Sequence, residues 1–93
     1  MALRFSWDPQ KAAANLRKHG VAFPDAATAF GDPLSVTIPD PDHSANEARF
    51  LLVGMTAGGQ LVVIAHSERG NDIRLISARE ATRRERETYE EGE

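Results

Sequence analysis

The 93-residue sequence contains no cysteine. A chain without cysteine cannot form a disulfide bond, bind a metal through thiolates or use a thiol nucleophile. Long apolar stretches are missing as well, since none approaches the roughly 20 residues of a membrane-spanning helix. The N-terminal residues form too short and too interrupted a run for a signal peptide. Together these absences predict a protein that is located in the cytoplasm.

Motifs for several common chemistries are also missing. The three histidines, His19, His43 and His66, fall on a predicted helix end, a loop and a strand without the spacing of metal ligands. The glycines match no dinucleotide or phosphate-binding loop, and there is no Gly-x-Ser-x-Gly nucleophile elbow. We therefore predict that the protein uses neither a metal nor a cofactor.

Charge is distributed unevenly along the chain. The net charge of −3 argues against a general binder of polyanions. Residues 69–86, however, hold six arginines and only three acidic residues, while residues 87–93 hold four glutamates and no cation. Either the C-terminal segment neutralises its own charge through ion pairs between residues four positions apart, or its basic side chains bind an anion elsewhere.

The first third of the chain has the pattern of one strand and two helices. A short strand is predicted over residues 3–7, and Asp8-Pro9 is typical of a helix start. That helix should run to about Lys18 and end at Gly20. Apolar residues at helical spacing predict a second, two-turn helix over residues 23–30.

The remainder changes to the alternating pattern of strands. Strands are predicted over residues 34–38, 49–56, 60–68 and 73–79, with a hairpin at Ala57-Gly58-Gly59. Because Ser77-x-x-Glu80 has the spacing of a capping box, a weakly anchored helix is expected over residues 78–91. The prediction is one α+β domain over residues 1–93, with the order β-α-α-β-β-β-β-α, an antiparallel sheet and helices packed on one side.

A set of cations flanks these elements, and its members are the candidate catalytic residues: Lys18, His19, Arg49, Arg69, Arg74 and Arg79. A guanidinium beside a core is costly unless it meets an anion, and its planar fork suits phosphate. Metal-free RNA cleavage needs a base, cations for the phosphate and an acid. His19 is the candidate with a pKa nearest neutrality, and Glu80 or Glu85 are alternative bases.

Several of these residues also have a purely structural interpretation. His19 would be favoured at a helix C-terminus by the helix dipole alone. Internal ion pairs are the alternative for two arginines, with Asp72 or Glu68 as the partner of Arg74 and with Asp8 or Glu80 as the partner of Arg79. Trp7, which could stack on a base, is more typical of a residue packed against the core.

Two separated motifs carry a resemblance to a known family. The first comprises Trp7-Asp8, Lys11, Asn15, Lys18-His19-Gly20, Phe23 and Ala26, and the second comprises Ile76-Ser77-Ala78-Arg79-x-Ala81, Glu85-Arg86 and Tyr89-Glu90. In this order they resemble the opening and closing signatures of the BrnT toxins. The resemblance implies a RelE-like fold and a ribonuclease toxin of a type II toxin–antitoxin module.

The resemblance further implies that the toxin cleaves RNA, arrests translation and is neutralised by a BrnA-like ribbon-helix-helix antitoxin. The complex would bind operator DNA only through that antitoxin. Carried over position by position, the six cations above become the candidate active-site residues. A different hypothesis is a degenerate toxin without catalytic activity, which binds its partner and tunes repression.

Overall fold

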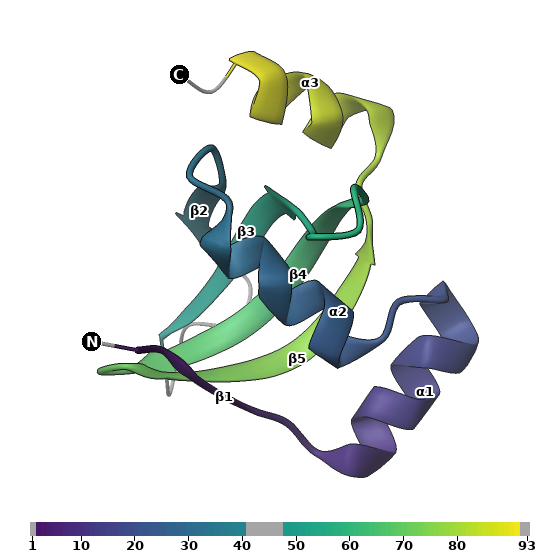
Figure 1. Ribbon diagram of the computed structural model, residues 1–93, viewed down its shortest axis with the longest axis vertical. Coiled ribbons are helices and arrows are strands. Elements are labelled where there is room, and N and C mark those ends of the chain that lie inside the picture. Colours follow the sequence, from purple (N-terminus) through teal and green to yellow (C-terminus); the bar gives the residue numbers. More distant parts are fainter. Residues whose placement is uncertain (1, 41–47, 92–93) are drawn as a thin grey trace.

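The computed structural model describes residues 2–40 and 48–91, in which helices pack against one five-stranded sheet (Figure 1). The elements are β1 (Arg4–Ser6), α1 (Pro9–His19), α2 (Phe23–Ala27), the 3-10 helix η1 (Thr28–Gly31), β2 (Val36–Pro39), β3 (Arg49–Met55), β4 (Leu61–Arg69), β5 (Asp72–Glu80) and α3 (Arg83–Glu91). The α+β class and the predicted order of elements are confirmed. The expected loop around His43 lies outside the described residues.

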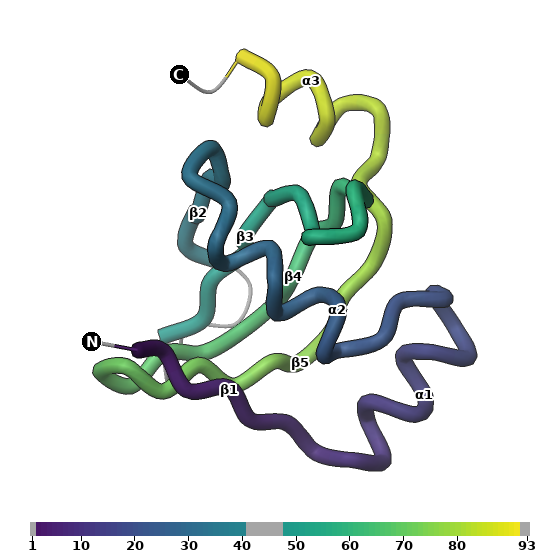
Figure 2. The backbone as a smooth tube through the Cα atoms, viewed as in Figure 1, coloured from purple at the N-terminus to yellow at the C-terminus, as the bar shows by residue number. Residues whose placement is uncertain are grey.

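The sheet is mixed, with the strand order β1-β5-β4-β3-β2. Strands β2 to β5 form the antiparallel meander that the sequence predicted. Strand β1 instead pairs in parallel with β5, so the prediction of a wholly antiparallel sheet is wrong for β1. The two helices that follow β1 return the chain across the sheet, which leaves β1 beside the last strand (Figure 2).

The main core lies between the helices α1, α2 and η1 and one face of the sheet, here called the core face. Alternate strand positions supply it, because side chains along a strand point to opposite faces. Its buried residues are Val21, Phe23, Ala26, Ala29, Leu52, Val62, Ile64, Ile73, Leu75 and Ala78. The helices from the first third of the chain therefore pack on one side, as predicted.

The opposite face of the sheet, here called the second face, is only partly covered. Val53, Leu61 and Val63 form a smaller cluster there, and Ala81 and Tyr89 from the C-terminal segment pack against it. Helix α3 lies across the end of the sheet in Figure 1. The prediction that all helices pack on one side is thus wrong for α3.

Helix α3 also begins later than predicted. Strand β5 continues to Glu80, because Ala78 is fully buried in the ladder opposite Ile64. The capping box is Thr82-x-x-Glu85 and not Ser77-x-x-Glu80. The Thr82 amide donates to the Glu85 carboxylate at 2.9 Å, and the Glu85 amide donates to the Thr82 hydroxyl at 3.2 Å. Two successive helix-start patterns exist in the sequence, and strand pairing decides between them.

Candidate functional site

A row of four polar side chains crosses the second face. Ser6, Arg74, Ser67 and Arg49 are paired neighbours on β1, β5, β4 and β3. They alternate along the strands with residues of the core face, so they point away from the main core. Ser67 is buried, with 8% of its surface exposed. Two arginines on alternate strands therefore flank one serine hydroxyl.

A second row lies next to the first, where β4 turns into β5. Arg4, Asp72 and Arg69 are paired across β1, β5 and β4. The Arg4 Nε donates to the Asp72 carboxylate at 2.7 Å. The sequence offered Asp72 as a possible partner of Arg74. In the structure Asp72 pairs with Arg4 instead.

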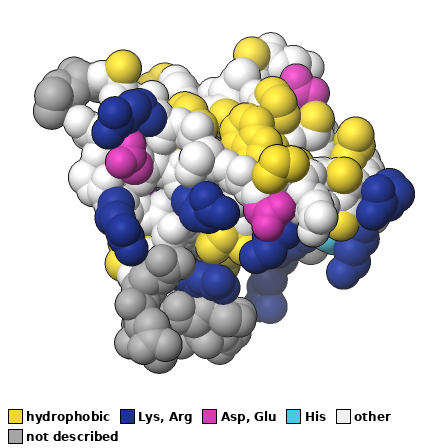
Figure 3. Space-filling view, turned by 90° about the horizontal axis from the view of Figure 1, so that it is seen from below, with side chains coloured by type: hydrophobic (Ala, Val, Ile, Leu, Met, Phe, Trp, Pro, Cys, Tyr) yellow, Lys and Arg dark blue, Asp and Glu magenta, His cyan; other side chains and the backbone are white. Residues whose placement is uncertain are grey.

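Both rows, apart from Arg49, line an open cavity of about 480 Å³, here called the cationic cavity. Its polar lining consists of Arg4, Ser6, Ser67, Glu68, Arg69, Asp72 and Arg74. Within residues 2–40 and 48–91, no carboxylate forms an ion pair with Arg49, Arg69 or Arg74. In the view of Figure 3, Lys and Arg side chains are spread across the whole width of the visible surface. Such a cavity can bind an anion.

Helix α1 holds two further candidates, Lys18 and His19, beside β5. The Asn15 amide occupies the edge of β5 beyond the end of β1, donating to the Ala78 carbonyl at 2.8 Å and accepting from the Ala78 amide at 3.1 Å. It also donates to the Val21 carbonyl at 3.0 Å. Asn15 therefore has a buried structural role, with 7% of its surface exposed.

Around Asn15 lies a second, shallower pocket of about 210 Å³. Lys11, Lys18 and His19 line it together with Ser77 of β5. The helix ends there because Gly20 adopts a left-handed conformation, with φ of 72°, and donates its amide to Leu16 at 2.9 Å. Lys18 and His19 thus project from the last turn toward β5, where the helix dipole also favours them.

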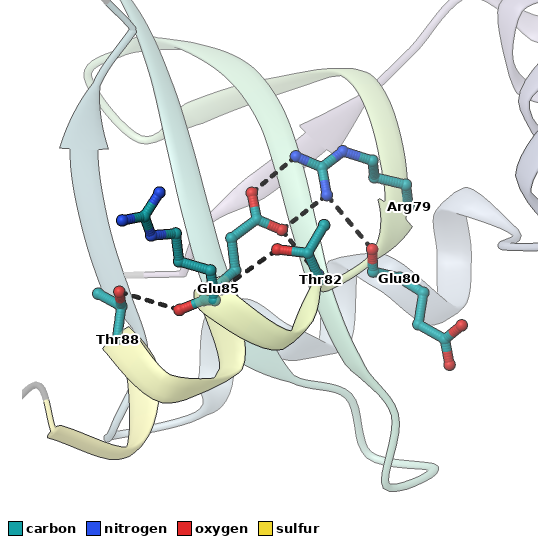
Figure 4. Close-up of polar contacts among 6 residues, drawn as sticks. Arg79, Glu80, Thr82, Glu85 and Thr88 are labelled. Carbon is teal, nitrogen blue, oxygen red and sulfur yellow. Dashed lines mark hydrogen bonds and ion pairs between the residues drawn. The ribbon is translucent and has the colours of Figure 1, made fainter.

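Arg79 lies further along β5, opposite Val63. Its guanidinium donates to both oxygens of Glu85, at 2.7 and 2.8 Å, and more weakly to the Glu80 carbonyl at 3.3 Å (Figure 4). The two carboxylates proposed from the sequence as its partner, those of Asp8 and Glu80, were the wrong choices. Glu85 lies in the next helix, α3, and the turn after β5 brings its carboxylate next to the Arg79 guanidinium.

The ion pair changes the protonation behaviour of both groups. The hydrogen bonds that Arg79 donates to Glu85 lower the pKa of Glu85 to about 2, and the contacts of Glu85 with Thr82 act in the same direction. The same carboxylate raises the pKa of Arg79. A general base is most effective when its pKa lies near the working pH. Glu85 is therefore a poor base at neutral pH.

Comparison with known proteins identifies the family. A family model described as "Ribonuclease toxin, BrnT, of type II toxin-antitoxin system" matches residues 7–85. This chain belongs to the BrnT family. Its fold is similar to the crystal structure of the Brucella abortus ribonuclease toxin BrnT, with a TM-score of 0.68 and 22% identity over 88% of this chain and 100% of that one. No curated protein sequence matches it significantly.

The six candidates in this BrnT chain form three groups along β5. Arg49, Arg69 and Arg74 belong to the two rows at the cationic cavity, Lys18 and His19 flank the second pocket, and Arg79 lies toward α3. Sequence reasoning missed Arg4 and Ser67 at the cavity and Lys11 in the pocket. The alternation of Arg4 and Ser6 with Phe5 is the signal that places Arg4 on the second face.

Other residues of the BrnT chain prove to be structural. Trp7 packs edge-on against Phe23 at 5.8 Å, which confirms the core interpretation. His66 is fully buried between Phe30 and Phe50, and its Nε2 lies 2.9 Å from a Glu68 oxygen. Glu68, the other partner considered for Arg74, pairs with His66 and forms no ion pair with Arg74. Among the described residues no three His, Cys, Asp or Glu side chains form a metal-type cluster. None of the described helices is long and apolar enough to cross a membrane.

Proposed function

We propose that this BrnT family member is a metal-independent endoribonuclease that inhibits translation in the cytoplasm and is neutralised by a cognate antitoxin. The observation that carries the proposal is the cationic cavity, where Arg69 and Arg74 lack carboxylate partners among the described residues. An arginine fork left without an acid is suited to a phosphodiester.

The reaction assigned to these side chains is attack of a ribose 2′-oxygen on the adjacent phosphorus. The 2′-hydroxyl gives up its proton and its oxygen forms a bond to phosphorus, the bond to the 5′-oxygen breaks, and that oxygen takes up a proton, so that a 2′,3′-cyclic phosphate and a free 5′-hydroxyl remain. Arg49, Arg69 and Arg74 would hold the phosphate and its additional transition-state charge. His19 is our candidate for proton transfer, with Lys18 beside it, and Glu80 is the remaining carboxylate alternative.

The partners in this proposal follow from the family. A type II toxin requires an antitoxin, which we take to be a BrnA-like ribbon-helix-helix protein. Operator DNA would then be bound only through that partner. The substrate of the free toxin is RNA, held mainly through its phosphates.

Incubation of the purified chain with RNA in the presence of a chelator tests the activity. We expect cleavage that produces 2′,3′-cyclic phosphate ends, and resistance of an RNA with a 2′-deoxy residue at the cleaved position. Intact RNA after incubation, or cleavage only after a divalent cation is restored, would rule out the proposed reaction.

One observation favours a second function. Because Glu85 already neutralises Arg79, one of the six candidates is committed to an internal ion pair. This is the arrangement expected of a degenerate toxin that only binds its partner and tunes repression. Expression without the antitoxin separates the two functions: growth arrest supports the ribonuclease, whereas harmless accumulation of soluble protein supports the binding module.

A further inference from the structure

The Arg79 guanidinium uses only part of its donor capacity. Arginine has five N–H groups. Two Nη1 hydrogens point to Glu85 and to the Glu80 carbonyl, and one Nη2 hydrogen points to Glu85. The Nε hydrogen and the second Nη2 hydrogen have no partner among residues 2–40 and 48–91. These two lie on the same side of the guanidinium and form a second, unused fork.

The side chain that carries this fork is partly exposed. The Arg79 side chain is 38% exposed, whereas the Glu85 side chain is 29% exposed. Arg79 lies on the second face, on the same strand as Arg74. At about 3.3 Å per residue, the five steps along β5 from Arg74 to Arg79 span roughly 16 Å. Arg79 therefore extends the cationic surface from the cavity toward α3.

The partner of the occupied fork is itself fixed in place. Glu85 accepts the Thr82 amide through the oxygen that also binds Arg79, and its own amide donates to Thr82 (Figure 4). The carboxylate is thus built into the first turn of α3 and has little freedom to move. An arginine gripped by a rigid carboxylate loses rotamer freedom before any ligand arrives.

We propose that Glu85 is a positioning residue, which grips Arg79 by one fork so that the Nε and Nη2 fork is presented to an RNA phosphate on the second face. This inference rests on the proposed ribonuclease function. Glu85 touches no substrate in this arrangement and acts only through Arg79. The contrary arrangement, in which Glu85 masks Arg79 from RNA, predicts the opposite response to removal of the carboxylate.

Glu85→Gln is the sharpest test, because glutamine preserves a capping box but carries no charge. We expect kcat for RNA cleavage to fall about tenfold with little change in KM, since a misplaced guanidinium acts mainly on the transition state. Glu87→Gln is the matched control. It removes the same charge from α3 at a side chain that is 60% exposed and pairs with Arg83 instead of Arg79, so kcat should stay near that of the original chain.

The outcomes separate the alternatives. Faster cleavage by Glu85→Gln would show that the carboxylate masks Arg79, and an unchanged rate would show that the pair is only structural; either result overturns the proposal. An equal loss of kcat in Glu87→Gln would also overturn it, because the loss of a negative charge from α3 would then account for the effect.

A second measurement does not depend on cleavage. The Arg79 Nε–H resonance is followed by NMR while a 2′-O-methyl RNA, which cannot be cleaved, is added. We expect the resonance to shift on addition of RNA, and the shift to be smaller in Glu85→Gln. Absence of a shift in the original chain would overturn the proposal, even if the protein cleaves RNA through its other cations.

Discussion

At the scale of single residues, the arginines of the second face differ in what already binds them. Arg4 and Arg79 have internal carboxylates, whereas Arg74 has none among the described residues. The sequence predicted Arg74 and Arg79 as candidates and missed Arg4, and the carboxylates that it offered as alternative partners are not the ones observed. Asp72 and Arg74 are near neighbours in the chain, but pairing with β1 brings Arg4 to Asp72 instead.

Arg74→Ala should abolish most of the RNA cleavage. Loss of one preorganised donor at a developing charge typically costs about 100-fold in kcat. The matched control is Arg83→Ala, which removes the same charge from a side chain that is 93% exposed on α3. Steady-state cleavage assays on both variants check this prediction. Equal activity of the two variants would contradict a specific role for Arg74.

Asn15→Ala should lower the free energy of unfolding by about 2–3 kcal/mol, because it leaves buried backbone groups of Ala78 and Val21 without partners. Lys18→Ala, one turn further along an exposed surface, should change it by less than about 0.5 kcal/mol. Urea denaturation of both variants measures the difference. If Asn15→Ala unfolds like Lys18→Ala, the amide does not hold α1 to β5.

At the scale of elements, α3 is held to the sheet by polar contacts at both ends. Its first turn is tied to Arg79 through Glu85. Near its other end, the Tyr89 hydroxyl donates to Asp32 at 2.6 Å, and the same Asp32 oxygen accepts the Met55 amide at 2.8 Å. The Tyr89 hydrogen bond is the main cause of the lowered pKa of Asp32. The sequence indicated a weakly anchored helix, but nothing local in it pairs Tyr89 with Asp32.

Tyr89→Phe should therefore loosen α3 while the rest of the fold remains intact. Loss of one hydrogen bond to a charged acceptor is expected to cost about 1.5–3 kcal/mol. Hydrogen exchange should become faster over Arg83–Glu91 and stay unchanged in β4. Thr88→Ala, which removes a hydroxyl that bonds only within the helix, is the control. Unchanged exchange in α3 would show that Tyr89 does not anchor it.

The Arg79–Glu85 pair should also make stability depend on pH. The pKa of Glu85 is lowered from 4.5 to about 2 in the folded chain. The pair therefore contributes fully above about pH 4.5, and its contribution is lost as the pH falls toward 2. Denaturation at pH 7 and pH 3 should show that the free energy of unfolding falls less between these two pH values for Glu85→Gln than for the original chain. Equal losses would show that the pair does not stabilise the fold.

At the scale of the whole molecule, the local patterns predict the elements, and contacts between distant segments decide their arrangement. The alternation of apolar and polar residues over β3 to β5 is sufficient to predict the antiparallel meander. The parallel pairing of Phe5 with Ile73 and the packing of Tyr89 against β3 and β4 join segments far apart in sequence. No local pattern records such pairings. The same limit applies to the site, where the cations were predictable and their grouping along β5 was not.

The central claim is that the cations of the second face bind RNA phosphates, and the salt dependence of binding tests it most directly. A 2′-O-methyl RNA allows affinity to be measured without cleavage. If Arg49, Arg69 and Arg74 each neutralise a phosphate, the slope of log K against log salt should be about −2, with roughly 0.7 lost in each alanine variant. A slope near zero, or one that the three variants leave unchanged, would contradict the account.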